Sequence, residues 1–164
     1  MELRDAERHD AEILGEIHAA SWQAAYAPFF DPAFAAEQVR ARRTWWPERI
    51  GQGPGRILLA EADGRPTAFS VSVPSTARPG LAEIYSFYCH PDAWGAGVAA
   101  VLMTGTLRRL REDGFAGVHL WTLRDTPRSR RFYAKSGFWE TGAERPHDFG
   151  DGSPLLQVEY ERGC

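Results

Sequence analysis

A glycine-bearing turn between a strand and a helix is the sequence feature that most limits how this chain can fold. Residues 82–90 are rich in strand-forming side chains, Gly95 and Gly97 follow them, and apolar residues then recur at helical spacing as far as Leu110. Residues 118–123 alternate like a further strand. A strand, a helix and a second strand predict a right-handed crossover with parallel strands. The first N–H groups of the helix then lack intrahelical partners and favour an anion.

The rest of the chain alternates between strand and helix periodicity, which predicts one domain of mixed α/β class within 164 residues. Asp63-Gly64 between two apolar runs is a hairpin signal, so the strands on either side should pair antiparallel. Asp10, Thr126 and Pro127 are expected at the starts of helices. Further strands are expected at Leu3, 56–62, 66–73, 138–141 and 155–160, and helices after Asp10, at 32–46, from Gly97 to Gly114 and from Thr126 to Gly137.

The composition and charge of the chain exclude several classes of protein. A formal net charge of −3 and a sequence pI near 6.0 give no basic field that would bind nucleic acid. No apolar run reaches membrane-spanning length and the first residues form no signal segment, so a cytoplasmic protein without a membrane partner is expected. Cys89 and Cys164 are too few for a disulfide framework, and the scattered histidines have no metal-ligand spacing, so no metal is expected.

The glycines of the turn also fit a second nucleotide-binding pattern. Gly95-x-Gly97-x-x-Ala100 matches the dinucleotide fingerprint G-x-G-x-x-G/A. In that fingerprint the first glycine follows a strand directly, near the start of a domain, whereas residues 90–94 intervene here and three expected strands precede. Asp125, the acidic residue after the next strand, lies well beyond the expected position. A dinucleotide-binding protein therefore stays a remote alternative.

Several stretches of the sequence together match one known family. Residues 82–92 form one such stretch, and Trp94-x-x-Gly97-x-Ala99 lies where that family has its acyl-CoA signature, Gln/Arg-x-x-Gly-x-Gly/Ala. Residues 130–138 carry a Phe-Tyr pair at a fixed interval before Gly-Phe, and residues 21–26 are similar to a first-helix region. On these motifs the chain resembles the GCN5-related N-acetyltransferases, the GNAT superfamily, over nearly its whole length.

This resemblance implies a central, twisted, mostly antiparallel sheet that splays between its fourth and fifth strands and is flanked by helices. It also implies acetyl-CoA as co-substrate, with the pyrophosphate on the backbone N–H groups of the turn and the pantetheine arm paired to the splayed strand. An N–H group of that strand would stabilise the oxyanion formed during acetyl transfer. The implied cofactor-binding residues are Phe87, Tyr88, Cys89, Gly95, Ala96, Gly97, Val98, Ala99, Ala100 and Thr126.

The sequence departs from the family pattern at the turn itself. Trp94 replaces the usual Gln or Arg, and Ala96 replaces a common basic residue beside the pyrophosphate. Binding would therefore depend mostly on backbone N–H groups, with Arg128 or Arg130 as a possible supplement. Thr126 stands where the family often has an Asn on the pantetheine arm, and helix capping is its other candidate role.

Two residues are implied to act in catalysis. Tyr133 matches the family tyrosine that protonates the departing thiolate, and the alternative is simple packing beside Phe132. Glu83 is the candidate base, acting directly or through water, and a solvated charge or a substrate anchor is equally open. Trp121 lies where some members carry a catalytic Glu, so proton loss to solvent with catalysis by positioning also stays open.

The acceptor site is expected to be rich in aromatic side chains. The expected substrate-binding residues are Trp22, Tyr26 and Tyr85, and core packing explains Trp22 equally well. The predicted function is transfer of an acetyl group from acetyl-CoA to a primary amine, on a small molecule or a peptide, in a ternary complex. A catalytically weak or inactive acyl-CoA-binding module of the same fold is the alternative, and a homodimer stays open.

Overall fold

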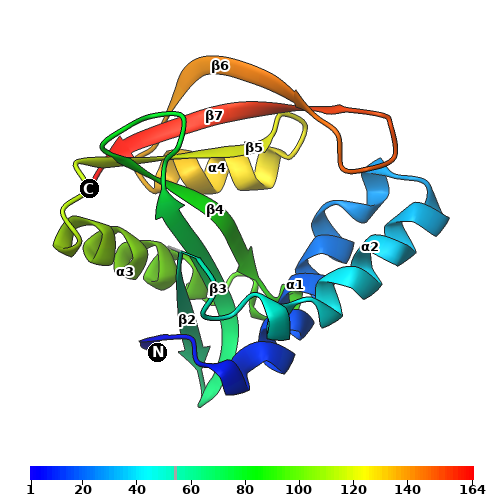
Figure 1. Cartoon of the computed structure of the whole chain (residues 1–164), viewed down its shortest axis with the longest axis horizontal. Coiled ribbons are helices and arrows are strands. Elements are labelled where there is room, and N and C mark those ends of the chain that lie inside the picture. Colours follow the sequence, from blue (N-terminus) through cyan, green and yellow to red (C-terminus); the bar gives the residue numbers. More distant parts are fainter. Residues whose placement is uncertain (54) are drawn as a thin grey trace. The chain divides into compact units, whose positions relative to one another are not determined.

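The computed structural model describes residues 1–53 and 55–164, which form two compact units. Unit 1 comprises Met1–Val73 with Ser86–Thr106, and unit 2 comprises Pro74–Tyr85 with Leu107–Cys164. The strands are β1 (Glu2–Asp5), β2 (Arg56–Ala62), β3 (Arg65–Pro74), β4 (Leu81–Cys89), β5 (Gly117–Leu123), β6 (Trp139–His147) and β7 (Leu155–Gly163). The α-helices are α1 (Ala11–Ala25), α2 (Pro32–Thr44), α3 (Val98–Glu112) and α4 (Pro127–Lys135). The chain therefore has the predicted mixed α/β class (Figure 1).

Unit 1 contains strands in the hydrogen-bonding order β1-β2-β3-β4, of which β4 contributes its last residues. β1 pairs antiparallel with β2, and β2 pairs antiparallel with β3. The predicted hairpin is confirmed, because Asp63 and Gly64 have φ values of 53° and 75°, which suit a tight two-residue turn.

Helices α1 and α2 of unit 1 lie side by side (Figure 1). They approach each other closely at Gly15, where an added Cβ would lie 2.1 Å from the carbonyl oxygen of Arg43. Leu14 and Ile17 on α1 pack with Trp46 and Phe69 in one buried core. Asp31 caps α2 by accepting N–H bonds from its first turn. The sequence expectation of a helix to residue 46 is corrected, because α2 ends at Thr44 and a short 3₁₀ turn follows at Trp46–Glu48.

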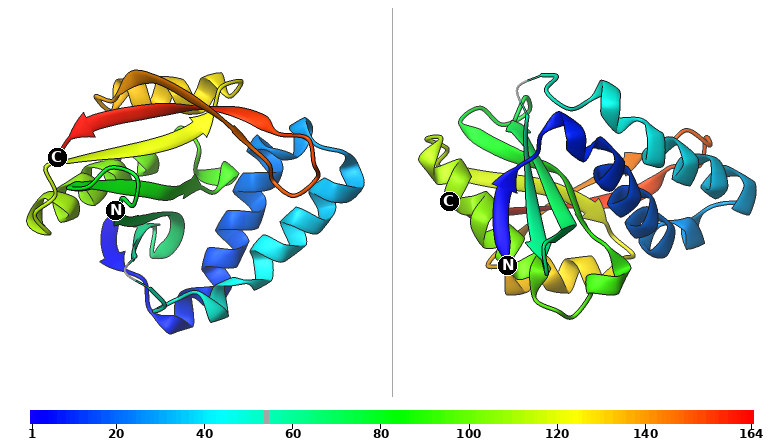
Figure 2. Two further views of the ribbon diagram at one scale, coloured as in Figure 1. Left: turned by 45° about the horizontal axis from the view of Figure 1, so that its top comes forward. Right: turned by 90° about the horizontal axis from the view of Figure 1, so that it is seen from below.

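Unit 2 contains strands in the order β4-β5-β7-β6, and α4 lies along one face of them (Figure 2). β4 and β5 are parallel, as the crossover predicts, whereas β5 pairs antiparallel with β7 and β7 with β6. The parallel ladder covers only three residue pairs, from Leu81 with Gly117 to Glu83 with His119. The hydrogen-bonded ladder therefore ends at Glu83, and the resemblance implies that the two strands splay beyond it.

The start of α1 differs in detail from the sequence expectation. Asp10 is the N-cap residue of α1 but makes no capping bond, because its carboxylate accepts the Glu7 N–H at 2.7 Å and two N–H bonds from Arg4 at 2.8 Å. These bonds lower the pKa of Asp10.

Strand β6 is also longer than the expected 138–141. Within the described ranges, no helix is long and apolar enough to cross a bilayer.

Candidate functional site

The glycine turn of unit 1 exposes backbone at the start of a 15-residue helix. Gly95 and Gly97 have φ values of 84° and 82°, and a Cβ built on either would meet nothing within 4 Å. The first intrahelical bond is donated by Val101 to Gly97, so the N–H groups of residues 98–100 precede the ladder. Ala96 and Ala100 are exposed and small. The turn thus presents N–H groups, and it leaves room for an anionic group to approach the backbone.

Trp94 points back to the end of strand β4. Its indole Nε1 donates to the carbonyl oxygen of Cys89 at 2.9 Å, and the Ser21 hydroxyl donates to the same oxygen at 3.0 Å. The Trp94 hydrogen bond therefore connects the start of the turn to the end of β4 within unit 1. Sequence reasoning did not single out Ser21; its signal was a small polar residue on the buried face of the first helix, four residues after Ile17.

The last residues of β4 alternate between two environments. Phe87 and Cys89 pack against the core cluster that includes Val98 and Leu102 of α3. Tyr88 faces the opposite way, toward the aromatic side chains of α1. The two faces of this part of β4 therefore pack against two different clusters of buried side chains. All three residues that are predicted to contact the pantetheine arm lie directly before the turn.

An aromatic cluster surrounds His18 in unit 1. The His18 ring lies 4.5 Å from that of Tyr88 and 5.3 Å from that of Trp45, measured between centroids. His18 is 3% exposed, and its Nδ1 has no hydrogen-bond partner among the described residues. Burial and the positive charges of Arg42 and Arg49 lower the pKa of His18 to about 3, so the ring is neutral at physiological pH.

Two of the predicted acceptor residues belong to this aromatic region. Trp22 is fully buried and stacks on Phe30 at 5.3 Å with 13° between the rings, so packing accounts for it directly. Tyr26 lies 6.0 Å from Trp22 and 6.4 Å from Tyr88, and burial of its hydroxyl raises its pKa. Arg42 lies over the Trp22 ring at 4.5 Å. Of the two predicted acceptor residues, Trp22 is buried and Tyr26 is half-buried, so Tyr26 is the more accessible.

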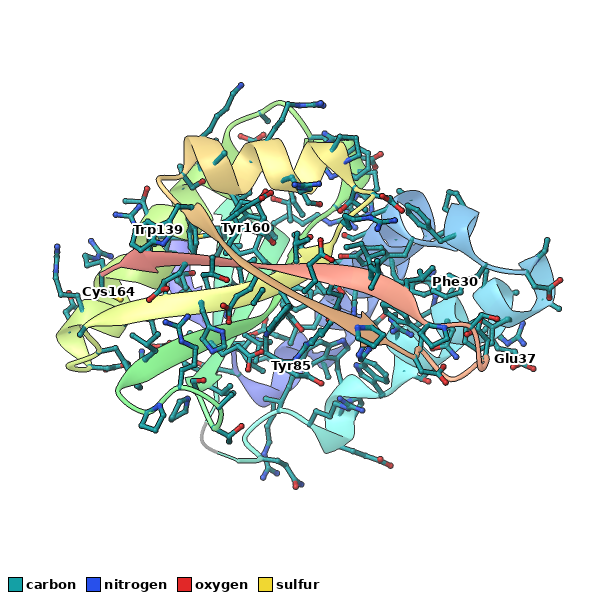
Figure 3. The ribbon with its side chains drawn as sticks, turned by 90° about the horizontal axis from the view of Figure 1, so that it is seen from above. Phe30, Glu37, Tyr85, Trp139, Tyr160 and Cys164 are labelled. Carbon is teal, nitrogen blue, oxygen red and sulfur yellow. The ribbon has the colours of Figure 1, made fainter. Side chains whose placement is uncertain are left out.

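In unit 2, Tyr133 lies on α4 among aromatic rings. It is buried, and its ring centroid is 5.9 Å from that of Tyr160 and 5.8 Å from that of Phe138. The Tyr160 hydroxyl, between α4 and β7 in Figure 3, donates to Glu140 at 2.8 Å and accepts from Arg130 at 3.2 Å. These rings fix the orientation of the Tyr133 side chain.

Glu83 and Tyr133 lie on opposite faces of the unit 2 strands. Glu83 pairs with His119, whereas Tyr160 pairs with Leu120, the next residue along β5. Successive residues of a strand point to opposite sides, so Glu83 faces away from Tyr160 and from the Tyr133 ring that contacts it.

Tyr85 shares the face of Glu83, two residues further along β4. Its side chain is 68% exposed (Figure 3). On the same side of β5, Trp121 carries the Arg145 guanidinium over its ring at 4.3 Å. The position at which some family members have an acid is therefore a cation–π pair here.

The hydroxyl of Thr126 has a different partner from the one expected of a helix cap. It donates to the carbonyl oxygen of Leu123 at 2.7 Å, and it accepts no N–H from α4 although Thr126 is the N-cap residue. Its oxygen lone pairs stay available to accept a hydrogen bond. Arg130 is engaged inside unit 2 with Tyr160, the Arg124 carbonyl and Glu140, which makes it a poor supplement for a phosphate.

Comparison with known proteins shows the family. The profile of the acetyltransferase (GNAT) family matches residues 16–138. A mycothiol acetyltransferase of Sanguibacter keddieii is 34% identical over 126 residues, which are 73% of this chain but only 39% of that protein. An uncharacterized N-acetyltransferase of Archaeoglobus fulgidus is 27% identical over 93% of this chain and 99% of its own length.

Solved structures share the fold. The PaiA N-acetyltransferase of Thermoplasma acidophilum, solved in complex with coenzyme A, superimposes with a TM-score of 0.76 at 20% identity, over 99% of this chain and 98% of that one. Within the described residues, no group of three or more His, Cys, Asp or Glu side chains is placed to hold a metal ion. The chain belongs to the GNAT family of acetyl-CoA-dependent acyltransferases.

Proposed function

We propose that this protein transfers the acetyl group of acetyl-CoA directly to a primary amine, with both substrates bound at once. The observation that carries the proposal is the exposed turn at Gly95–Gly97, which opens α3 with N–H groups that precede the helical ladder. A helix start of this kind binds anionic groups such as a pyrophosphate.

The residues of this turn fit coenzyme A without the usual polar side chains. The space beside Gly95 and Gly97 is open, so backbone can approach the phosphates from Gly95 through Ala100. Trp94, where the family has Gln or Arg, donates its N–H to Cys89 and so serves the turn rather than the ligand. Phe87, Tyr88 and Cys89 are proposed to flank the pantetheine arm, and Thr126 to accept one of its amide N–H groups.

Tyr133 is proposed as the acid that protonates the departing thiolate. Its ring packs against those of Phe132, Phe138 and Tyr160, which hold the side chain in one orientation. General acid catalysis by a positioned group accelerates such steps by about 10²-fold or more.

Glu83 is proposed as the base that takes the proton of the ammonium acceptor, directly or through water. Its face is opposite to that of Tyr133. The proposed base and the proposed acid would therefore act from different faces of the strands. The parallel ladder ends at Glu83, so the carboxylate stands at the last paired position of β4.

The acceptor is proposed to be a primary amine on a small molecule or a peptide. Tyr26 and Tyr85 are the proposed contacts, since the first is partly exposed and the second is 68% exposed. Trp22 is assigned the supporting role of packing behind Tyr26. Proton removal by solvent remains sufficient if the amine is bound in its neutral form.

The experiment is a thiol-release assay with acetyl-CoA over a panel of amino acids, peptides with free N-termini, small amines and amine-bearing antibiotics. Thermal unfolding with coenzyme A, acetyl-CoA and NADH precedes it, because only a ligand of the folded state raises the midpoint. Stabilisation by NADH alone would contradict the proposal. Binding of coenzyme A without turnover of any acceptor would support the alternative function, a non-catalytic acyl-CoA-binding module.

Tyr133→Phe tests the acid, and Tyr160→Phe is the matched control because it also removes one tyrosine hydroxyl from the same ring cluster. The expected result is a fall in kcat of about 10²-fold for Tyr133→Phe, with unchanged affinity for coenzyme A. Tyr160→Phe should lower stability through the lost Glu140 bond and leave kcat near that of the parent protein. An equal kcat for the two variants would remove Tyr133 from the role.

A further inference from the structure

Unit 2 contains a chain of three side chains that the acetyl transfer does not use. The Ser75 hydroxyl lies 2.7 Å from Nε2 of His119, and Nδ1 of the same ring lies 3.0 Å from Oε2 of Glu159. Ser75 belongs to the connection between β3 and β4, His119 to β5 and Glu159 to β7. A serine, a histidine and a carboxylate in this order are the arrangement of a nucleophilic hydrolase triad.

The direction of each hydrogen bond follows from what the groups can donate. A carboxylate only accepts, so His119 Nδ1 carries the hydrogen toward Glu159. In the neutral ring Nε2 is then an acceptor, and the Ser75 O–H must donate to it. This is the tautomer that lets a histidine act as the base of a serine nucleophile.

The carboxylate of Glu159 is held in place by further donors. Thr141 donates its hydroxyl to Oε1 at 2.7 Å, and the Arg78 guanidinium lies 3.5 Å from the same oxygen. Glu159 is 7% exposed and His119 is 2% exposed. Glu159 therefore fixes the orientation and the tautomer of the His119 ring, as a histidine base requires.

Ser75 is the least buried residue of the three. Ser75 is half-buried, and its backbone N–H donates to Leu81 at 2.9 Å, which fixes the start of the connection. Its oxygen accepts the Arg78 N–H at 3.0 Å and gives its hydrogen to His119. A hydroxyl oxygen has two lone pairs, so one is left for attack on an electrophile.

We propose that Ser75, His119 and Glu159 form an acyl-accepting site that takes acyl groups from activated esters. Ser75 Oγ attacks the carbonyl carbon of the ester and its proton passes to His119 Nε2; the bond to the leaving oxygen then breaks with its electron pair, and that oxygen takes the proton from His119. Water next attacks the acyl-serine and gives a proton to His119 Nε2; the bond to Ser75 Oγ breaks, Ser75 Oγ takes that proton, and the free acid is released. The net reaction is ester hydrolysis at a site that requires no coenzyme A.

The test uses the full chain without coenzyme A. p-Nitrophenyl acetate should give a burst of p-nitrophenolate and an acetyl group on the peptide that contains Ser75, and a fluorophosphonate probe should label the same residue. Ser75→Ala should abolish the burst and the label, and His119→Gln should slow both by about 10²-fold. Ser75→Cys, which keeps a nucleophile, should still be acylated. Ser153→Ala, at an exposed serine of the β6–β7 loop, is the matched control and should behave as the parent.

The outcomes separate this site from a structural network and from the acetyltransferase. Thermal stabilisation by coenzyme A reports that each variant is folded, and Tyr133→Phe should leave the burst intact. Folded parent protein whose Ser75 stays unlabelled overturns the proposal, as does a burst that survives Ser75→Ala. Loss of amine acetylation with an intact burst would count against the proposed function alone.

Discussion

The indole of Trp94 and the hydroxyl of Ser21 converge on one atom, the carbonyl oxygen of Cys89, at 2.9 and 3.0 Å. Trp94, the residue that departs most from the family signature, thus makes a stabilising hydrogen bond within unit 1. It binds the start of the turn to the end of β4, where the family's polar residue would instead face the cofactor.

Trp94→Phe should cost stability without costing affinity. An aromatic ring is kept while the pyrrole part of the indole and its hydrogen bond are lost, so the free energy of unfolding should fall by about 1 kcal/mol or more in urea titrations. Calorimetric titration should give coenzyme A affinity close to that of the parent. Ser21→Ala, which removes the other donor to the same oxygen, should show a similar loss. A large fall in affinity with unchanged stability would mean that the indole serves the ligand.

Gly97→Ala should weaken coenzyme A binding beyond its effect on folding. A φ of 82° disfavours a side chain by about 1 kcal/mol, and the open space means that an added methyl group would meet the ligand rather than protein. Gly152→Ala is the control, because its φ of 75° and open surroundings match. Both variants should lose similar stability, and only Gly97→Ala should bind coenzyme A more weakly. Equal affinities would argue against the turn as the phosphate site.

Thr126→Val separates the two uses of one hydroxyl. Loss of the bond to Leu123 should lower the free energy of unfolding by about 1 kcal/mol. If the oxygen also accepts an N–H of the pantetheine arm, affinity for coenzyme A should fall about fivefold as well. Thr126→Ser should restore both properties. Recovery of stability with no change in affinity across the series would confine Thr126 to a structural role.

His18 should make the protein lose stability in mild acid. The pKa of His18 is lowered from 6.5 to about 3 in the fold, so the unfolded chain takes up a proton that the folded chain refuses. Stability from this source is present above pH 6.5 and is lost as the pH falls toward 3, by up to about 1.4 kcal/mol per pH unit.

The check compares the free energy of unfolding against pH for the parent and His18→Phe. The variant should show a shallower acid slope, since it has no group to titrate in the unfolded state. His9→Gln, at an exposed histidine, should retain the parent slope. Parallel curves for parent and His18→Phe would show that His18 titrates normally in the fold.

Local patterns carried most of the fold prediction. The Asp63-Gly64 hairpin and the parallel crossover of β4 and β5 depend on short-range conformation and on chain handedness, and both are confirmed. The hydrogen bonds at the ends of helices were harder to predict from the sequence. Asp10 and Thr126 occupy the expected N-cap positions, yet their side chains bond elsewhere because Arg4 and Leu123 offer competing partners.

The contacts that sequence reasoning missed are non-local. Ser21 and Cys89 are 68 positions apart, and His119 and Glu159 are 40 apart. Periodicity reports which face of an element is buried, but it does not report which polar group on another strand will meet it. The assignments of Tyr133 and Glu83 stay predictions, as do those of the remaining proposed site residues.

The close approach at Gly15 limits how this protein could be re-engineered for other acceptors. Any side chain there would collide with the Arg43 carbonyl and push α2 away, and Arg42 would then move off the Trp22 ring. Exposed side chains of α2 such as Glu37 can be exchanged freely. The spacing of the two helices cannot, so a library of variants in this region should hold Gly15 constant and vary only the outer face of α2.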